Sequence, residues 1–128
     1  MNAKENLIKA FKKIELKIED IKVINLSTLD GFPLCTHYFN SSSNKLEDDK
    51  LSAAVSSMAA LSQAAAKQMI GSKFSSTTIE TENGSMLLVK TKYNKASCIL
   101  CFITGNNHQI GQVRYFAFKL SDYLKHSL

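Results

Sequence analysis

The chain is poor in the residues that proteins use to read nucleic acids. Its 128 residues include no tryptophan, one proline and a single arginine, Arg114. Arginine recognises bases and phosphates through paired N–H donors. The net charge of +5 comes from lysines that alternate with carboxylates, a pattern typical of solvated helix faces. We therefore expect no nucleic-acid partner.

Cysteine is also scarce, and three cysteines without an export signal favour reduced thiols. Cys98 and Cys101 lie in an apolar run, where residues three apart on a strand point to opposite faces. A shared disulfide or metal is therefore disfavoured, and we expect buried core thiols. No stretch is long and apolar enough to span a membrane. A cytoplasmic protein without membrane insertion is expected.

The residue patterns of common catalytic sites are missing as well. The five glycines stand singly, so there is no glycine-rich phosphate loop. The three histidines lie far apart with no carboxylate at metal-ligand spacing, and the serines near residue 56 have no base at a readable spacing. The sequence predicts no metal, no cofactor and no enzymatic activity.

The most informative stretch that is present runs from residue 51 to residue 66 without a charge. Three acidic residues before it suit the start of a helix and Gly71 suits its end, so a helix over residues 47–70 is predicted. At 100° per residue, its expected core face holds Leu51, Ala54, Val55, Met58, Leu61, Ala65 and Met69. The opposite stripe is small and smooth: Ala53, Ser57, Ala60 and Ala64, with Ser56 and Gln63 beside it.

The small-residue stripe can be interpreted in three ways. Small side chains let another backbone come close, which favours a partner helix. That partner is either a helix of the same chain or a second copy, and a third possibility is an alanine-rich face left exposed because alanine favours the helix. The choice depends on how many other helices the chain can place against this one.

Apolar periodicity predicts the remaining elements. An amphipathic helix is expected over residues 3–18, and two strands flank Asp30-Gly31, a sequence typical of a type I′ turn. Pro33 places the second strand at a sheet edge. Residues 74–82 and 85–92 flank Asn83-Gly84 as a second tight hairpin, residues 96–103 form a central strand, and a last helix follows residue 107.

These elements predict one domain over residues 1–128, a three-layer α/β sandwich with topology αββαβββα. Its five-stranded, mainly antiparallel sheet has the order 2-1-5-4-3, with the central helix on one face and the terminal helices on the other. The small-residue stripe then has no cover within the chain. The strand over residues 74–82 is an edge with no proline to protect it.

An open edge beside an uncovered helix favours a two-fold homodimer. The predicted contact residues come from the central helix and from the edge strand. They are Ala53, Ser56, Ser57, Ala60, Gln63, Ala64, Lys67, Ser75, Thr77, Ile79 and Thr81.

The whole pattern resembles the dynein light chain roadblock family, which includes MglB-type proteins. Residues 29–34 (LDGFPL) match the family's D-G-x-P-L/I hairpin, and an Ala/Ser-rich helix begins near Leu51. Residues 78–80 (TIE) precede residues 83–89 (NGSMLLV), and residues 105–111 (GNNHQIG) resemble the family's G-x-N-L-G motif. The resemblance extends over about residues 23–124.

The resemblance implies a non-enzymatic dimeric scaffold, formed with itself or with a paralogous roadblock protein, that binds or regulates a small Ras-like GTPase. Candidate GTPase contacts are Ser52, Gln63, Lys67 and Arg114. The family often has further arginines on its last helix, whereas this chain has only Arg114. A small-molecule sensor and a purely structural subunit remain as alternatives, and a pocket lined by Cys98, Cys101 and Phe102 would support the sensor.

Overall fold

The computed structural model describes residues 2–39, 48–106 and 109–127. The expected polar loop over residues 40–44 and the first residue of the expected central helix lie outside this range. The elements are α1 (Ala3–Glu15), β1 (Ile21–Thr28), β2 (Pro33–Tyr38), α2 (Asp48–Ala65), a π-helical turn η1 (Ala66–Ile70), β3 (Ser76–Thr81), β4 (Gly84–Tyr93), β5 (Ala96–Thr104) and α3 (Ile110–Ser127).

The five strands form one sheet in the order β2-β1-β5-β4-β3, which confirms the predicted order. Each neighbouring pair of strands is antiparallel. The central strand, β5, pairs with β1 on one side and with β4 on the other. This position explains its continuous apolar sequence, since a strand covered on both faces needs no polar side.

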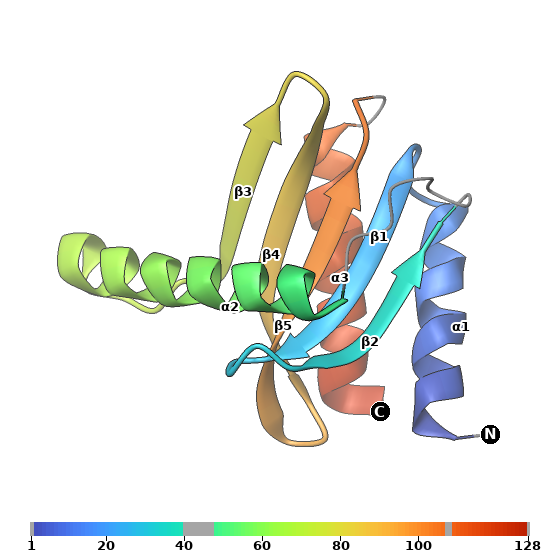
Figure 1. The fold of residues 1–128 in the computed structure, drawn as a ribbon, viewed down its shortest axis with the longest axis horizontal. Helices are drawn as coiled ribbons and strands as arrows, with labels where there is room; N and C mark the ends of the chain where they lie inside the picture. Colours follow the sequence, from blue (N-terminus) through green and yellow to red (C-terminus); the bar gives the residue numbers. More distant parts are fainter. Residues whose placement is uncertain (1, 40–47, 107–108, 128) are drawn as a thin grey trace.

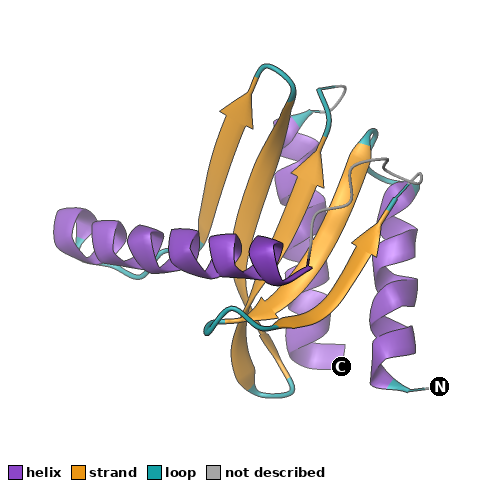
Figure 2. Ribbon diagram, in the orientation of Figure 1, coloured by secondary structure: helices purple, strands orange, loops and turns teal. Residues whose placement is uncertain are grey.

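Three layers are visible in Figure 1: α2 lies on one face of the sheet, and α1 and α3 lie on the other. The helices in Figure 2 make the arrangement easy to follow, because α2 runs across the strands whereas α1 and α3 run along them. The predicted division of the helices between the two faces is confirmed.

The larger core lies between the sheet and the α1/α3 pair. Every second residue of β5 enters it, with Cys98, Leu100 and Phe102 almost completely buried. The opposite face of the same strand presents Ile99 and Cys101 to α2. Alternation along a strand thus divides one apolar run between two cores.

The hairpins differ in detail from the sequence predictions. The predicted type I′ turn at Asp30-Gly31 is wrong: β1 and β2 are joined by a longer loop, residues 29–32, in which only Gly31 has a positive φ (94°). Type I′ turns need positive φ at two successive residues. That geometry occurs instead at Asn94 and Lys95, with φ of 51° and 66°, between paired Tyr93 and Ala96.

The β3–β4 hairpin is tight, as predicted, but its two loop residues are Glu82 and Asn83, because Thr81 pairs with Gly84. The Thr81 hydroxyl donates to the Gly84 carbonyl oxygen (2.8 Å) and accepts from the Asn83 N–H (3.2 Å). A Cβ at position 84 would collide with the carbonyl oxygen of Thr104. The glycine is therefore needed for a close backbone approach rather than for the turn itself.

Candidate functional site

The candidate site begins with the way α2 lies on the sheet. The helix crosses the strands, and its C-terminal part projects past β3 at the edge of the sheet (Figure 1). Its buried residues are accordingly confined to the first three turns: Leu51, Ser52, Val55 and Ala59. The rest of the helix has no sheet beneath it to bury a complete apolar face.

The predicted core face of this helix is therefore wrong at four of its seven residues. Leu61 is 71% exposed and Met69 is 80% exposed. Ala54 and Ala65 are exposed as well. These side chains face away from the sheet or lie past its edge, so the isolated chain leaves large apolar groups in water.

A buried polar network holds the first turn of α2 against β1. The Asn25 side-chain amide donates to the Thr36 hydroxyl (2.8 Å) and to the Ser52 hydroxyl (3.3 Å). The Ser27 hydroxyl donates to the Asn25 amide oxygen (2.6 Å) and lies 2.7 Å from the Ser52 hydroxyl. Since the Ser27 proton is used on Asn25, Ser52 must donate to Ser27, and the three side chains close a ring. A fully satisfied buried network fixes one register of packing.

The loop between β1 and β2 also contacts α2. The Ser56 hydroxyl donates to the Leu29 carbonyl oxygen (2.7 Å). A Cβ on Gly31 would lie 3.4 Å from the Ser56 Cβ and 3.6 Å from the Ala53 Cα. Glycine permits both this approach and the positive φ at position 31.

The start of α2 is tied to β2 by one further hydrogen bond. The Tyr38 hydroxyl donates to the Asp48 carboxylate at 2.8 Å. Partial burial, together with this hydrogen bond and the negative charge of Asp48, raises the pKa of Tyr38 to about 12. The phenol therefore stays protonated and keeps donating throughout the neutral range.

The predicted small-residue stripe is exposed over its full length. Ala53, Ser57, Ala60 and Ala64 face solvent. The Ser57 hydroxyl donates back to the Ala53 carbonyl oxygen (3.0 Å), so its donor is already used within the helix. The stripe therefore presents a shallow, mostly apolar surface that no described helix covers.

The outer edge of β3 borders this stripe. Among the described strands, β3 pairs only with β4, so its other edge presents backbone donors and acceptors. The Thr77 hydroxyl donates to the Ser62 hydroxyl (2.5 Å) and joins the strand to α2. Ile79 is 40% exposed two residues further along.

Beyond Thr77, α2 no longer covers the sheet, and Ile79, Met86 and Ile103 line an open cavity of about 350 Å³. The residue pattern of the sequence did not assign Met86 or Ile103 to this surface. It also missed Ile70, which is exposed at the projecting end of the helix. The exposed stripe, the free β3 edge and these apolar side chains together form what we call the α2–β3 surface.

The helix ends in a way that keeps its last turn ordered past the sheet. Residues 66–70 form the π-helical turn, and Gly71 closes it with φ of 78°. The Gly71 N–H donates to the carbonyl oxygens of Ala66 (3.0 Å) and Lys67 (3.1 Å). A left-handed glycine is a common helix terminator, and the sequence correctly placed the stop here.

The four candidate GTPase contacts do not form one cluster. Ser52 is fully buried in the polar network and cannot be reached by a partner, so its assignment was wrong. Gln63 is half-buried and accepts the Phe74 N–H at 3.4 Å, and Lys67 is exposed beside it. Arg114 is on α3, behind the sheet, where its guanidinium donates to the Ser76 hydroxyl (3.1 Å).

The three cysteines do not form a ligand site. All are free and buried, and burial raises the pKa of Cys101 to about 12. Cys98 and Phe102 belong to one core whereas Cys101 belongs to the other. The pocket that would have supported a small-molecule sensor is thus not formed by these residues.

Residues 2–39, 48–106 and 109–127 lack two features by which other proteins bind metals or cross membranes. Within these ranges, no group of three histidine, cysteine or carboxylate side chains is placed to hold a metal ion. No helix there is both long and apolar enough to cross a bilayer.

Comparison with known proteins gives one family match and several matches to solved structures. The family model for the Roadblock/LC7 domain matches residues 15–100. No curated protein matches the sequence.

Several solved structures share the fold at low sequence identity. An MglB structure with a tetrameric arrangement is 17% identical, with 98% of this chain and 90% of that chain covered and a TM-score of 0.85. MglB from Myxococcus xanthus is 17% identical over 97% and 95% of the two chains, with a TM-score of 0.80. MglC from the same organism is 12% identical over 95% and 98%, with a TM-score of 0.65.

Proposed function

Because the chain belongs to the Roadblock/LC7 domain family, we propose that it is a single-domain, non-enzymatic scaffold that dimerises and binds a small Ras-like GTPase in the cytoplasm. The observation that supports this most directly is the α2–β3 surface. It combines a free strand edge, a stripe of small helical residues and exposed large apolar side chains. Each of these features is costly to leave in water and is satisfied by a second protein chain.

A two-fold arrangement would pair the two β3 edges and set the two α2 helices side by side across the axis. If the β3 edges of two copies pair, the two sheets become one, and the projecting end of each α2 reaches over the partner's strands. Met69 and Ile70 would then cover the apolar patch formed by Ile79, Met86 and Ile103 of the other copy. A self-complementary patch of this kind is what a two-fold interface requires. The partner is a second copy or a paralogous roadblock protein.

The paired α2 helices would form a broad platform for the GTPase. Lys67 is exposed on the π-helical turn η1, which continues α2, and its charge suits an acidic patch on a partner. Gln63 beside it is half-buried. Arg114 stands on the other side of the sheet, so it belongs to this contact only if the GTPase reaches around the β3 edge.

The dimer is tested by sedimentation at micromolar concentrations. The wild-type chain should sediment as a dimer, and Ala60→Glu should shift it to a monomer, because two carboxylates would be buried near the two-fold axis. Gln112→Glu is the matched control, since it adds the same charge at an exposed position of α3. A wild-type chain that remains monomeric would overturn the proposed interface, as would an Ala60→Glu variant that stays dimeric.

The GTPase is tested by binding and by GTP-hydrolysis assays with Ras-like GTPases from the same organism. We expect one of them to bind the dimer, and Lys67→Glu to weaken that binding at concentrations where the variant still sediments as a dimer. Lys125→Glu, on the exposed end of α3, is the charge-matched control. Failure of every such GTPase to bind would leave the dimer as a structural subunit without this partner.

A further inference from the structure

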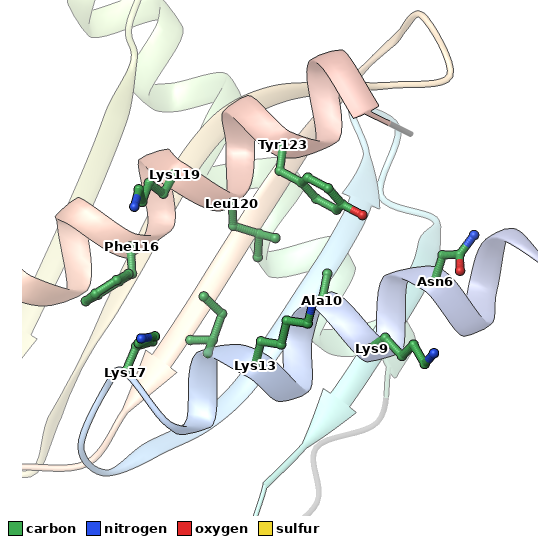
Figure 3. Close-up of a pocket in the computed structure, with 10 residues that line it drawn as sticks. Asn6, Lys9, Ala10, Lys13, Lys17, Phe116, Lys119, Leu120 and Tyr123 are labelled. Carbon is green, nitrogen blue, oxygen red and sulfur yellow. The ribbon is translucent and has the colours of Figure 1, made fainter.

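A second surface lies on the opposite side of the sheet from α2. A groove of about 320 Å³ separates α1 from α3 and is shown in Figure 3. One stripe of α1 and the turn after it form one wall, and one stripe of α3 forms the other. The lining residues are Asn6, Lys9, Ala10, Lys13, Ile14, Lys17, Phe116, Lys119, Leu120 and Tyr123.

The floor of this groove is apolar. Ile14 and Leu120 are buried members of the larger core, and Ala10 and Phe116 are partly buried against it. Ala10 is the smallest side chain of the α1 wall, and a small residue between larger ones leaves room for an incoming side chain. The floor therefore continues the core outward to a surface that no described element covers.

The rim of the groove carries charge of one sign. Lys9, Lys13, Lys17 and Lys119 line it, and no carboxylate does. The acidic residues of these two helices, Glu5 and Glu15 on α1 and Asp122 on α3, are absent from the lining. Four lysines thus surround one apolar trough.

The shape of the groove favours an elongated occupant. The lining residues of α1 extend from Asn6 to Ile14, which at 1.5 Å per residue is roughly 12 Å, or a little more than two helical turns. On α3, Lys119, Leu120 and Tyr123 follow Phe116 by three, four and seven residues. This is the spacing of residues on one face of a helix. A third helix laid between two helices contacts both walls along this length.

We propose that the α1–α3 groove binds an acidic amphipathic helix of a partner protein. Its apolar face would rest on Ala10, Ile14, Phe116 and Leu120, and its carboxylates would flank it on both sides, opposite the lysines. Apolar burial supplies most of the affinity in such a contact, and the charges supply selectivity and association rate.

The concave shape distinguishes this occupant from an anionic membrane. Membrane-binding surfaces place apolar side chains outward, where they enter the lipid, whereas here the apolar residues lie at the bottom of a trough between lysines. The groove is also separated from the α2–β3 surface by the whole thickness of the sheet. The two surfaces can therefore be occupied at the same time.

The test uses the full chain and a labelled helical peptide of about 14 residues, with leucines at helix spacing and glutamates on both flanks. Fluorescence anisotropy should show binding that is lost when the glutamates are replaced by lysines or the leucines by serines. The variant Lys9→Glu/Lys13→Glu should bind about tenfold more weakly or worse. Ala10→Leu, which fills the floor without changing the charge, should weaken binding as well.

The matched control is Lys4→Glu/Lys12→Glu, which makes the same charge change at exposed positions of α1 outside the groove. It should bind the acidic peptide within about twofold of wild type. Equal weakening by this control would reduce the effect to net charge and overturn the proposal. Binding to phosphatidylserine vesicles in preference to the peptide, with the same dependence on Lys9 and Lys13, would replace it by a membrane contact.

Discussion

The two faces of the sheet are completed in different ways. On the α1/α3 face, nineteen buried apolar residues among those described form one core, and on the α2 face only seven do. The smaller core is supplemented by a ring of polar side chains around Asn25. One face is thus closed mainly by apolar area within the chain, and the other is held in register by hydrogen bonds and left partly open.

This difference shows how a small domain can reserve a surface for another molecule without losing its own stability. Apolar burial is the main favourable term in folding, and here most of it is placed on the side that needs no partner. The α2 face needs only enough contact to position one helix. Its remaining apolar groups are then available for association.

The largest expected effect compares two successive residues of β5. Phe102, in the larger core, is almost fully buried, whereas Ile103 is only half-buried on the α2 face. In the Ala60→Glu background, which we expect to be monomeric, Phe102→Ala should lower the free energy of unfolding by about 3–5 kcal/mol. Ile103→Ala should cost less than about 2 kcal/mol. Urea denaturation measures both, and an equal loss would mean that the two faces are equally well covered.

A smaller effect tests whether hydrogen bonds hold the α2 face. Asn25→Ala should lower the free energy of unfolding by about 1–3 kcal/mol, because Ser27 and Ser52 lose buried partners. Replacing the ring by Asn25→Val, Ser27→Ala and Ser52→Ala together should cost less than the single change, since no buried polar group is then left unpaired. If the triple variant were clearly less stable than Asn25→Ala, the hydrogen bonds of the ring would stabilise the fold beyond pairing its buried polar groups.

The smallest effect concerns the hydrogen bond between Tyr38 and Asp48. Tyr38→Phe should lower the free energy of unfolding by about 1 kcal/mol or less at neutral pH. The pKa of Tyr38 is raised from 10.0 to about 12, so its stabilising contribution is complete below pH 10. The unfolded chain ionises first as the pH rises, and the contribution is lost between pH 10 and 12.

The difference in stability between the wild type and Tyr38→Phe should therefore shrink over that interval. Denaturation of both proteins at pH 8 and pH 11 measures the change, and titration of other groups cancels in the comparison. A difference that grows with pH would show that the pKa of Tyr38 is lower in the folded chain than in the unfolded chain, contrary to the effect of burial and Asp48.

Much of the fold could be predicted because local patterns agreed with one another. The apolar run at residues 96–103 identified the central strand. The Asn83-Gly84 dipeptide between two strand-like segments identified a hairpin, although its loop is one residue earlier. From these the strand order followed. The exposed stripe at Ala60 and its neighbours was also predicted correctly.

The orientation of α2 could not be predicted from periodicity alone. Periodicity shows which residues share a side of the helix, but it does not show how far the sheet extends beneath them. The helical segment of residues 48–70 is roughly 35 Å long, whereas five strands spaced by about 4.8 Å span roughly 24 Å. A helix lying across such a sheet must project, which is why Met69 and Ile70 are exposed.

The polar ring was invisible for a different reason. Asn25 and Ser27 alternate with apolar residues and would suit a solvent-facing side of β1, and only the position of Ser52 on the neighbouring helix shows that they are buried. Likewise, lysines of α1 line a groove only because α3 lies beside them. Sequence separation hides contacts that depend on two distant elements.

The two edges of the sheet set a limit on how far the protein can assemble. The β2 edge begins with Pro33, which has no N–H to donate, whereas the β3 edge contains no proline. A sheet with two open edges can add copies without end and grow into a fibre. If copies pair only through their β3 edges, each dimer uses both of these edges. Strand pairing between copies would therefore stop at two.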